Sequence, residues 1–339
     1  NLSKVTLDGT GQLVYTGIRH LGNGIIDDCN FTEIKYNPSG PDYQGTAIQI
    51  ISTATVNVTN SMFTQIGRNG ILADQCTGTY SGNMYTGKGA GDWLDYFILS
   101  EYGDIVTISN NTIYNCLGIA SVGGSGFSAI AVWDDPATQA TISGNTMTNN
   151  STGIGIVGIN GVTTDPTVVI GAGNLFDGGD YGVTMEQYSG PYTPSVTFTG
   201  MSTFKGQAIA ALFVDNGISA GVTIDISSAE FRTAGNVLIT DNFAKEDLVI
   251  HAIDAGNRAL FVWNPTNVYV TTSSFIPPFT STAKVQRGVD ASSNTWTVNV
   301  ANGTYDEQVA VNKSLTIKGA NAGIAGNGVR GLESIIDGN

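Results

Sequence analysis

Short segments in which apolar and polar residues alternate recur along most of the chain. In one of them, Val106 and Ile108 are apolar, while Thr107 and Ser109 are polar. This is the period of a β-strand that buries one of its two faces. A polar turn and a further apolar residue follow each segment, without the 3.6-residue period of an amphipathic helix. The pattern therefore predicts many short strands joined by tight turns.

The alternating segments form a repeat. Each can be aligned on the residue that closes it, at Phe31, Phe63, Tyr85, Tyr114, Thr148, Phe176, Phe204 and Phe231. The intervals run from 22 residues, between Phe63 and Tyr85, up to 34 residues for the step that ends at Thr148. Repeats of this length without helical periodicity are typical of β-solenoids, in which each coil buries its apolar face against the next coil.

An asparagine recurs at one turn of the repeat. The positions are Asn60, Asn83, Asn110, Asn145 and Asn174. We expect their side-chain amides to hydrogen-bond from coil to coil along the stack. The 44 glycines and only 9 prolines are consistent with many tight turns between strands. We therefore predict an all-β fold, a parallel β-helix.

Four stretches carry a resemblance to a known group of proteins. They are GNGIIDDCNFTEIKYNPSGPDYQGTAIQI, YTGKGAGDWLDYFI, TISNNTIYNCLGIASV and VQRGVDASSNTWTVNVANGTYDEQVAVNKSLTIKGA. With these stretches the chain resembles the right-handed parallel β-helix proteins of the pectin-lyase-like superfamily over nearly its whole length. More narrowly, it is similar to β-helix modules of large secreted or surface proteins of bacteria. The resemblance implies an extracellular or cell-surface location, but not one function, because this fold hosts enzymes, adhesins and structural proteins alike.

The order of the segments is rotated relative to such modules. Residues 285–339 resemble the first coils of a β-helix, and the end SIIDGN reads as continuing into the start NLSKVTLDG. Residues 264–284 have the Ser/Thr-rich, Pro-containing composition of a linker. We therefore predict a main β-helix over 1–263, a linker over 264–284, and the first coils of a following or neighbouring β-helix over 285–339.

This order predicts a structural or adhesive unit that assembles head to tail, with the C-terminal coils of one copy against the N-terminal coil of another. A contact of this kind does not close on itself and produces a filament or array. The expected interface residues are Leu2, Val5, Leu7, Val14, Val298, Val300, Val309, Val311, Leu315, Ile317, Ile335 and Ile336. The same order would also arise in a piece of a longer tandem chain, in a natural permutation, or where the C-terminal coils form a small separate unit.

The net charge of the chain limits the classes of partner that it is expected to bind. The chain has 14 Lys and Arg against 28 Asp and Glu, a formal net charge of −14. A surface this acidic repels nucleic acids and anionic membranes. No stretch approaches the roughly 20 apolar residues that a membrane helix needs. We therefore expect the partner to be another copy of the chain or a glycan, without nucleic acid and without membrane insertion.

A polysaccharide-binding or polysaccharide-degrading β-helix is the alternative function. The resemblance implies either Asp-bound calcium with an Arg or Lys base, or an Asp group with a Gly-His-Gly element. Neither His20 nor His251, the only histidines, lies in that element. We therefore assign no catalytic residue, metal site or cofactor, with calcium as the one ion that the acidic pairs Asp27–Asp28 and Asp134–Asp135 suggest. Aromatic residues beside acids suit carbohydrate contact, at Trp93, Asp95, Trp133, Asp134 and Asp135.

The cysteines and the asparagines of N-x-[ST] sequences allow two further predictions. The three cysteines, Cys29, Cys76 and Cys116, lack metal-site spacing, and we expect buried thiols rather than one disulfide and a free thiol. Among the N-x-[ST] sequences, exposed ones are candidates for glycosylation. The candidates are Asn30, Asn110, Asn150 and Asn302.

Overall fold

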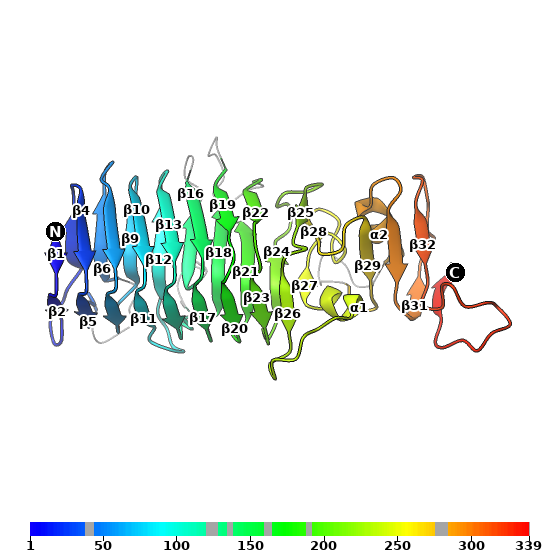
Figure 1. The fold of residues 1–339 in the computed structure, drawn as a ribbon, viewed down its shortest axis with the longest axis horizontal. Coiled ribbons are helices and arrows are strands. Elements are labelled where there is room, and N and C mark those ends of the chain that lie inside the picture. Colours follow the sequence, from blue (N-terminus) through cyan, green and yellow to red (C-terminus); the bar gives the residue numbers. More distant parts are fainter. Residues whose placement is uncertain are drawn as a thin grey trace.

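The computed structural model shows one elongated stack of β-coils with the two termini at opposite ends (Figure 1). It describes residues 1–37, 44–119, 128–133, 138–158, 165–187, 192–274 and 284–338. The strands of successive coils pair in parallel, which confirms the predicted all-β parallel β-helix.

Three sheets form the walls of the main solenoid, and each coil contributes one strand to each wall in the order A, B, C. Sheet A consists of β1 (Leu2–Ser3), β4 (Gly24–Asp27), β7 (Val56–Thr59), β10 (Thr77–Ser81), β13 (Ile105–Ser109), β16 (Gln139–Ser143), β19 (Thr167–Ile170) and β22 (Ser195–Phe198). Sheet B consists of β2 (Thr6–Asp8), β5 (Asn30–Thr32), β8 (Met62–Thr64), β11 (Met84–Thr86), β14 (Thr112–Tyr114), β17 (Thr146–Thr148), β20 (Leu175–Asp177), β23 (Thr203–Lys205) and β26 (Glu230–Arg232).

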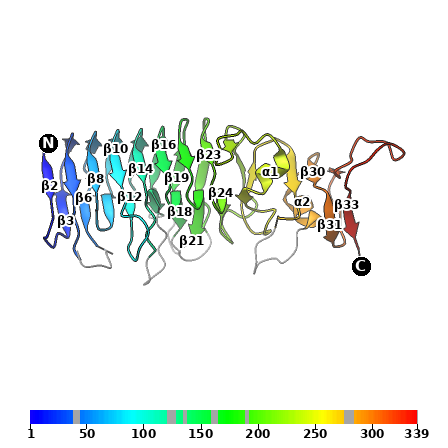
Figure 2. The ribbon, with the colours of Figure 1, turned by 90° about the horizontal axis from the view of Figure 1, so that it is seen from below.

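Sheet C is the third wall and runs the length of the main solenoid (Figure 2). It consists of β3 (Thr16–His20), β6 (Thr46–Ile51), β9 (Asn69–Asp74), β12 (Tyr96–Glu101), β15 (Ile130–Trp133), β18 (Thr152–Gly158), β21 (Tyr181–Gln187), β24 (Ala210–Val214) and β27 (Val249–Ile250). Most of its strands are longer than those of sheet B, so this wall offers the broadest outer face.

Smaller sheets and two short helices follow the main solenoid and continue the stack (Figure 1). The strands are β25 (Thr223–Asp225), β28 (Leu260–Val262), β29 (Asn267–Val270), β30 (Thr297–Val300), β31 (Gly303–Asp306), β32 (Thr316–Lys318) and β33 (Ser334–Asp337). The helices are α1 (Asn242–Glu246) and α2 (Val285–Ala291). Strand β29 lies in the first half of the segment expected to be a linker, and it pairs with β30. Residues 275–283 of that segment lie outside the described residues.

A column of hydrogen-bonded side chains lines the turn between sheets A and B. Asn83, Asn111, Asn145 and Asn174 stack there, and all four are buried. Each uses its side-chain oxygen to accept the backbone N–H of the preceding member, for example Asn111 from Asn83 at 2.9 Å and Asn145 from Asn111 at 3.0 Å. The column pairs backbone groups that the tight turn would otherwise leave unsatisfied inside the protein.

The prediction that Asn60 and Asn110 belong to this column was wrong by one position. Both have positive φ, 50° and 56°, and the equivalent residue in other coils is a glycine such as Gly144. That backbone conformation favours Asn and Gly. The buried column begins one residue later, so Ser61 and Asn111 occupy the positions predicted for Asn60 and Asn110.

A second column, of large apolar side chains, lies inside sheet B. Phe31 stacks on Phe63 with ring centroids 4.9 Å apart, and Phe176 stacks on Phe204 at 4.7 Å. Between these pairs the column contains Tyr85, Ile113 and Met147. The alignment of the repeat predicts Tyr114 and Thr148 there, again one residue late. A shift of one residue moves a side chain to the other face of a strand, and both residues face outward.

The buried apolar residues separate into a main core and a smaller C-terminal core. The main core extends from Ile26 to Tyr269, and the C-terminal core contains Val268, Val270, Val298 and Val300. The two cores meet at β28, where residues 260–262 are all buried. The segment from residue 233 to residue 274 at this contact is called the joint below. The three cysteines are buried and unpaired thiols, as predicted.

Candidate functional site

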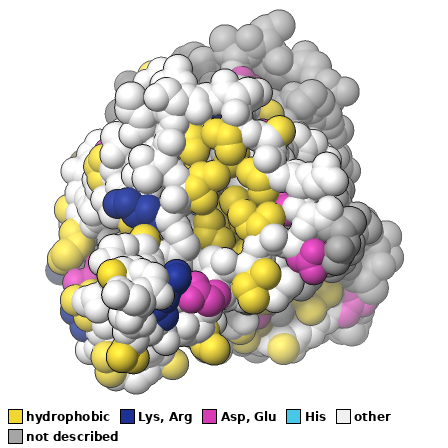
Figure 3. Space-filling view, turned by 90° about the vertical axis from the view of Figure 1, so that its right-hand side faces the viewer, with side chains coloured by type: hydrophobic (Ala, Val, Ile, Leu, Met, Phe, Trp, Pro, Cys, Tyr) yellow, Lys and Arg dark blue, Asp and Glu magenta, His cyan; other side chains and the backbone are white. Residues whose placement is uncertain are grey.

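The C-terminal end of the stack exposes apolar residues that belong to the interior of the coil. Ile317 pairs in register with the buried Val298, and Ile336 pairs with the buried Tyr305. In the end coil, however, Ile317 is 36% exposed and Ile336 is 45% exposed. Figure 3 shows apolar side chains gathered in the middle of this end of the molecule. A further coil placed on this face would extend both interior columns.

Some predicted interface residues lie elsewhere. Val298 and Val300 are fully buried in the C-terminal core, where β30 is covered by β29 on one side and β32 on the other, so their assignment to an interface was wrong. Ile335 pairs in register with the exposed Thr304 and therefore belongs to the outer wall. The residues that remain at this end are Val309, Val311, Leu315, Ile317 and Ile336.

The N-terminal end also exposes strand edges and interior apolar residues. Strands β1, β2 and β3 are the first strands of sheets A, B and C, so one edge of each faces away from the stack. Leu2 is in register with the buried Ile26, and Leu7 is in register with Phe31 of the aromatic column. Both leucines are only half-buried, as are Val5 and Val14. All four predicted residues thus lie on the first coil and pack against the main core from one side.

The predicted carbohydrate contacts do not form one site. Asp95 is fully buried and accepts hydrogen bonds from the Tyr85 hydroxyl and from Lys88 N, so it leaves no surface for a sugar. The Trp93 ring packs against the Lys88 side chain and donates its N–H to Gly89 O at 3.0 Å. Trp133 is half-buried at the end of β15, while Asp134 and Asp135 lie outside the described residues.

The candidate glycosylation sites also differ in exposure. Asn30 is exposed, and so is Asn302. Asn110 is also exposed at its turn, with its side chain on the outer surface. Asn150 is 3% exposed, its side-chain oxygen accepts Cys116 N at 2.9 Å, and its amide donates to Ile113 O. A glycan on Asn150 would have to break both bonds and leave a closed core, so Asn150 was a wrong candidate.

The joint contains a cluster of buried charged residues that the sequence did not reveal. Glu246, His251 and Asp254 are all buried, and their potential ligand atoms lie within 4.8 Å of one another. His251 Nε2 lies 3.3 Å from Glu246 Oε1, and Asp254 Oδ2 accepts the backbone N–H of His251 at 2.8 Å. Arg287 completes the cluster from helix α2 by donating to Ile253 O and Ser274 O. The isolated letters H, E and D in an irregular segment carry no pattern that could have predicted this.

The hydrogen bonds of His251 decide what this cluster can bind. Phe261 N donates to Nδ1 at 3.1 Å, so in neutral His251 the ring proton is on Nε2, facing Glu246. A metal ligand needs a free lone pair on the ring nitrogen. A metal at Nε2 would move the proton to Nδ1 and set it against the Phe261 N–H. The arrangement is therefore that of a structural ion and hydrogen-bond network. Burial, and next the charge of Glu246, raises the pKa of Asp254 to about 7.

The chain matches no protein-family model, no curated protein and no solved structure. Among the described residues, no helix has the length and apolar character required to cross a membrane. The assignment of the fold as a parallel β-helix therefore depends on the strand pairing alone. Any functional conclusion has to be drawn from the geometry of the site.

Proposed function

We propose that this protein is an extracellular structural unit that assembles head to tail, with the C-terminal coil of one copy stacked on the N-terminal coil of the next. The observation that carries the proposal is that interior columns of side chains reach both ends and remain half-exposed there. Leu2 and Leu7 are the first members at one end, and Ile317 and Ile336 are the last members at the other.

The strand edges support the same arrangement. Both ends present strands that run parallel within their sheets. A second copy in the same orientation would continue this parallel pairing, whereas a copy turned around would not. A contact between two different surfaces in constant orientation propagates without closing, which produces a filament. Unpaired edges of this kind are pairing templates that proteins normally cover.

The expected energy is moderate for each side chain. Burying the exposed half of one Ile or Leu contributes roughly 1 kcal/mol. The summed contribution of about eight to ten such residues has to exceed the free-energy cost of association, which is about 4–15 kcal/mol. Backbone hydrogen bonds at the edge strands β32 and β33 add to the apolar contribution. We therefore expect assembly to depend on protein concentration.

The sequence supplies the reason to choose a second copy as the partner. The end SIIDGN reads as continuing into the start NLSKVTLDG, so the first coil has the pattern of what should follow the last one. The resemblance to β-helix modules of bacterial surface proteins supports the extracellular location. Asn30, Asn110 and Asn302 lie where glycans could be attached without disturbing the stack.

The test is electron microscopy of the purified chain over a range of concentrations, with light scattering to measure mass. We expect filaments with an axial repeat of roughly 50–60 Å, from about 11 coils of about 4.8 Å each. The substitution Ile317→Asp should abolish them by placing a charge at the contact. Ile105→Asp, on the exposed outer face of β13, is the matched control and should leave them intact. Monomers at all concentrations, or filaments of the Ile317→Asp variant, would refute head-to-tail assembly.

A further inference from the structure

The outer face of sheet A is a regular array of small hydroxyl side chains. The inward residues of its strands, such as Ile108 and Ile142, are fully buried, so the residues that alternate with them face outward. In the six strands of this sheet from β7 to β22 the outward residues are Asn57, Thr59, Thr77, Thr79, Ser81, Ile105, Thr107, Ser109, Gln139, Thr141, Ser143, Thr167, Val169, Ser195 and Thr197. Eleven of these fifteen are Ser or Thr. This surface, whose strands lie side by side in Figure 1, is called the hydroxyl face below.

The pairing of the strands arranges these side chains in rows. Thr79, Thr107 and Thr141 are in register on β10, β13 and β16. Ser81 and Ser109 belong to the next row, where Ser109 Oγ donates to Ser81 Oγ at 3.0 Å. Residues of one row are about 4.8 Å apart, and neighbouring rows are about 6.6 Å apart, the length of two residues in a strand. The hydroxyl face is therefore a two-dimensional lattice.

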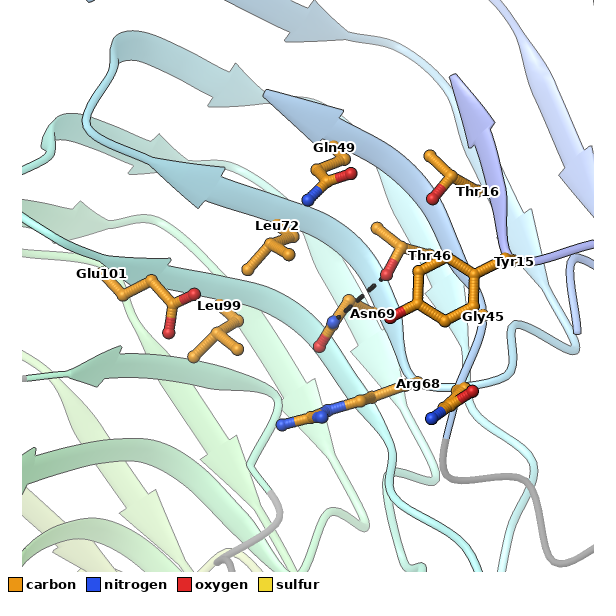
Figure 4. Close-up of a pocket in the computed structure, with 11 residues that line it drawn as sticks. Tyr15, Thr16, Gly45, Thr46, Gln49, Arg68, Asn69, Leu72, Leu99 and Glu101 are labelled. Atoms are coloured by element: carbon orange, nitrogen blue, oxygen red, sulfur yellow. Dashed lines mark hydrogen bonds between the residues drawn. The ribbon is translucent and has the colours of Figure 1, made fainter. Parts of the chain in front are cut away.

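The hydroxyl face carries no charge, unlike the other two walls. None of its fifteen outward side chains is acidic or basic, although the chain has 28 Asp and Glu. Sheet B presents an outward ion pair between Lys205 and Asp177, at 2.9 Å. Sheet C has a cleft of about 160 Å³ on its outer face. Large and charged side chains around this cleft include Tyr15, Arg68, Asn69 and Glu101 (Figure 4). The lack of charge is thus a property of one wall.

The composition of the hydroxyl face disfavours the partners that proteins most often bind. A charged partner would meet no opposite charge there. The two aromatic residues of these six strands, Tyr80 and Phe198, point into the core, so the face has no ring on which a sugar could pack. Only Ile105 and Val169 are apolar, which leaves little area for a protein partner to bury. The face suits a partner that is itself a lattice of hydrogen-bonding groups.

Ice is a partner of this kind. Its surface presents water oxygens at fixed intervals in two directions, and these intervals are comparable to the spacings of about 4.8 Å and about 6.6 Å on the face. A threonine hydroxyl donates and accepts hydrogen bonds as water does. Branching at Cβ restricts threonine to few rotamers, so the array loses little freedom when water orders on it. The lack of charge matters because a charged group orients its hydration water around itself.

Binding to ice depends on many contacts that form together. One hydroxyl contact replaces a hydrogen bond to liquid water and contributes little by itself. The six strands extend about 24 Å along the stack, and the rows extend about 13 Å across it, so many side chains can engage one surface at the same time. We propose that the hydroxyl face of sheet A binds the surface of ice, independently of assembly at the two ends.

The test is the growth of a single ice crystal in a solution of the intact chain, measured as the gap between the melting and freezing temperatures. We expect a gap that widens with protein concentration, and a faceted crystal, because bound chains stop the growth of the surface that they cover. Thr107→Lys and, separately, Thr141→Lys should abolish the gap, since a strongly hydrated ammonium group within the lattice keeps ice away. Both threonines are exposed, so the substitutions leave the core intact.

Thr112→Lys is the matched control. Thr112 lies on β14, in the same coil as Thr107, but on the outer face of sheet B. This variant should keep the gap, and all three variants should unfold at the midpoint of the wild type.

Three results would each overturn the proposal: no gap at any concentration, an unchanged gap with both Thr107→Lys and Thr141→Lys, or an equal loss with Thr112→Lys. Light scattering at the same concentrations tests the rival occupant, a second copy of the chain. Wild-type dimers that Thr107→Lys dissociates, without any gap in the wild type, would assign the face to pairing of two copies instead.

Discussion

The wall of the main solenoid and the joint handle buried polar atoms in two different ways. In the wall, Asn83, Asn111, Asn145 and Asn174 repeat one residue type at one position, and each pairs with the next. In the joint, unlike groups pair with one another, as Glu246 does with His251 and with Ser274. A constant spacing between coils allows the first solution. Where helix α1 and short strands interrupt the coil pattern, only a local network can satisfy the same need.

The comparison also indicates that the joint is more sensitive to the loss of one residue than the regular wall is. The three walls of the main solenoid contain eight, nine and nine strands, while the sheets after the joint contain two or three. A member of a long column has a neighbour on each side that holds it. A member of the joint has partners that differ in charge and come from different elements, so loss of one leaves the others buried and unpaired.

The largest effect should come from breaking the asparagine column at its centre. Asn145→Ala removes the acceptor of Asn111 N and the donor to Ile108 O, and both atoms stay buried. We expect a loss of about 3–5 kcal/mol in the free energy of unfolding, at about 1–3 kcal/mol for each unsatisfied group. Urea unfolding monitored by circular dichroism measures it.

The matched control for that prediction is Asn110→Gly. Asn110 lies outside the buried column and has a φ of 56°, a conformation that glycine adopts without strain. We expect a change below about 0.5 kcal/mol. Equal losses for the two variants would show that the buried column does not stabilise the wall.

Breaking the joint should have a slightly smaller but more local effect. Arg287→Met removes the donor to Ile253 O and Ser274 O and leaves the acids of the cluster without this cation. We expect a loss of about 2–4 kcal/mol, confined at first to β29 and residues 284–338. Hydrogen exchange should show faster exchange of β29 and β30 amides with little change in sheet A. Uniformly faster exchange in all walls would mean that the stack opens as one unit.

Asp254, which lies in the joint, should make the free energy of unfolding depend on pH, and this dependence distinguishes the joint from the wall. Its pKa of about 7 in the folded protein lies above the value of 3.8 expected in the unfolded chain, chiefly because of burial. Folded protein therefore retains a proton that the unfolded chain has released, so Asp254 contributes stability below about pH 4 that is lost as the pH rises through 7.

Asp254→Asn should remove this contribution to the pH dependence. Asparagine keeps an acceptor for His251 N but does not titrate. Between pH 4 and pH 7 the free energy of unfolding of the wild type should fall relative to that of the variant, by about 3 kcal/mol. Parallel pH profiles for the two proteins would place the titrating group elsewhere.

Several of the sequence predictions were confirmed because every coil of the repeat has to meet the same physical requirement. Alternation at residues such as Val106 and Ile108 identified strands, since each coil must bury one face and hydrate the other. The same pattern misplaced Tyr114, Thr148, Asn60 and Asn110 by one residue. Coil-to-coil spacings vary, and only the pairing of neighbouring strands shows which face a residue occupies.

The exposure of the proposed contact residues was harder to predict. Ile317, Leu2 and Leu7 were identified from apolar patterns, but Val298 and Val300 have the same pattern and are fully covered. Burial depends on whether another coil lies on top, which is not a local property. Asp95 was misjudged for the same reason, because its neighbour Trp93 suggested a surface loop while its carboxylate bonds inside.

The sequence by itself determined the kind of structure: short strands, one repeated turn, a parallel stack, and an acidic chain with apolar residues at both ends. These follow from local alternation and composition, which act within a few residues. The tertiary structure alone decided the joint and the cleft. Glu246, His251 and Arg287 meet there from separate elements, and Tyr15, Arg68 and Asn69 meet across neighbouring coils. Only stacking at about 4.8 Å brings residues more than about 50 positions apart into one cavity.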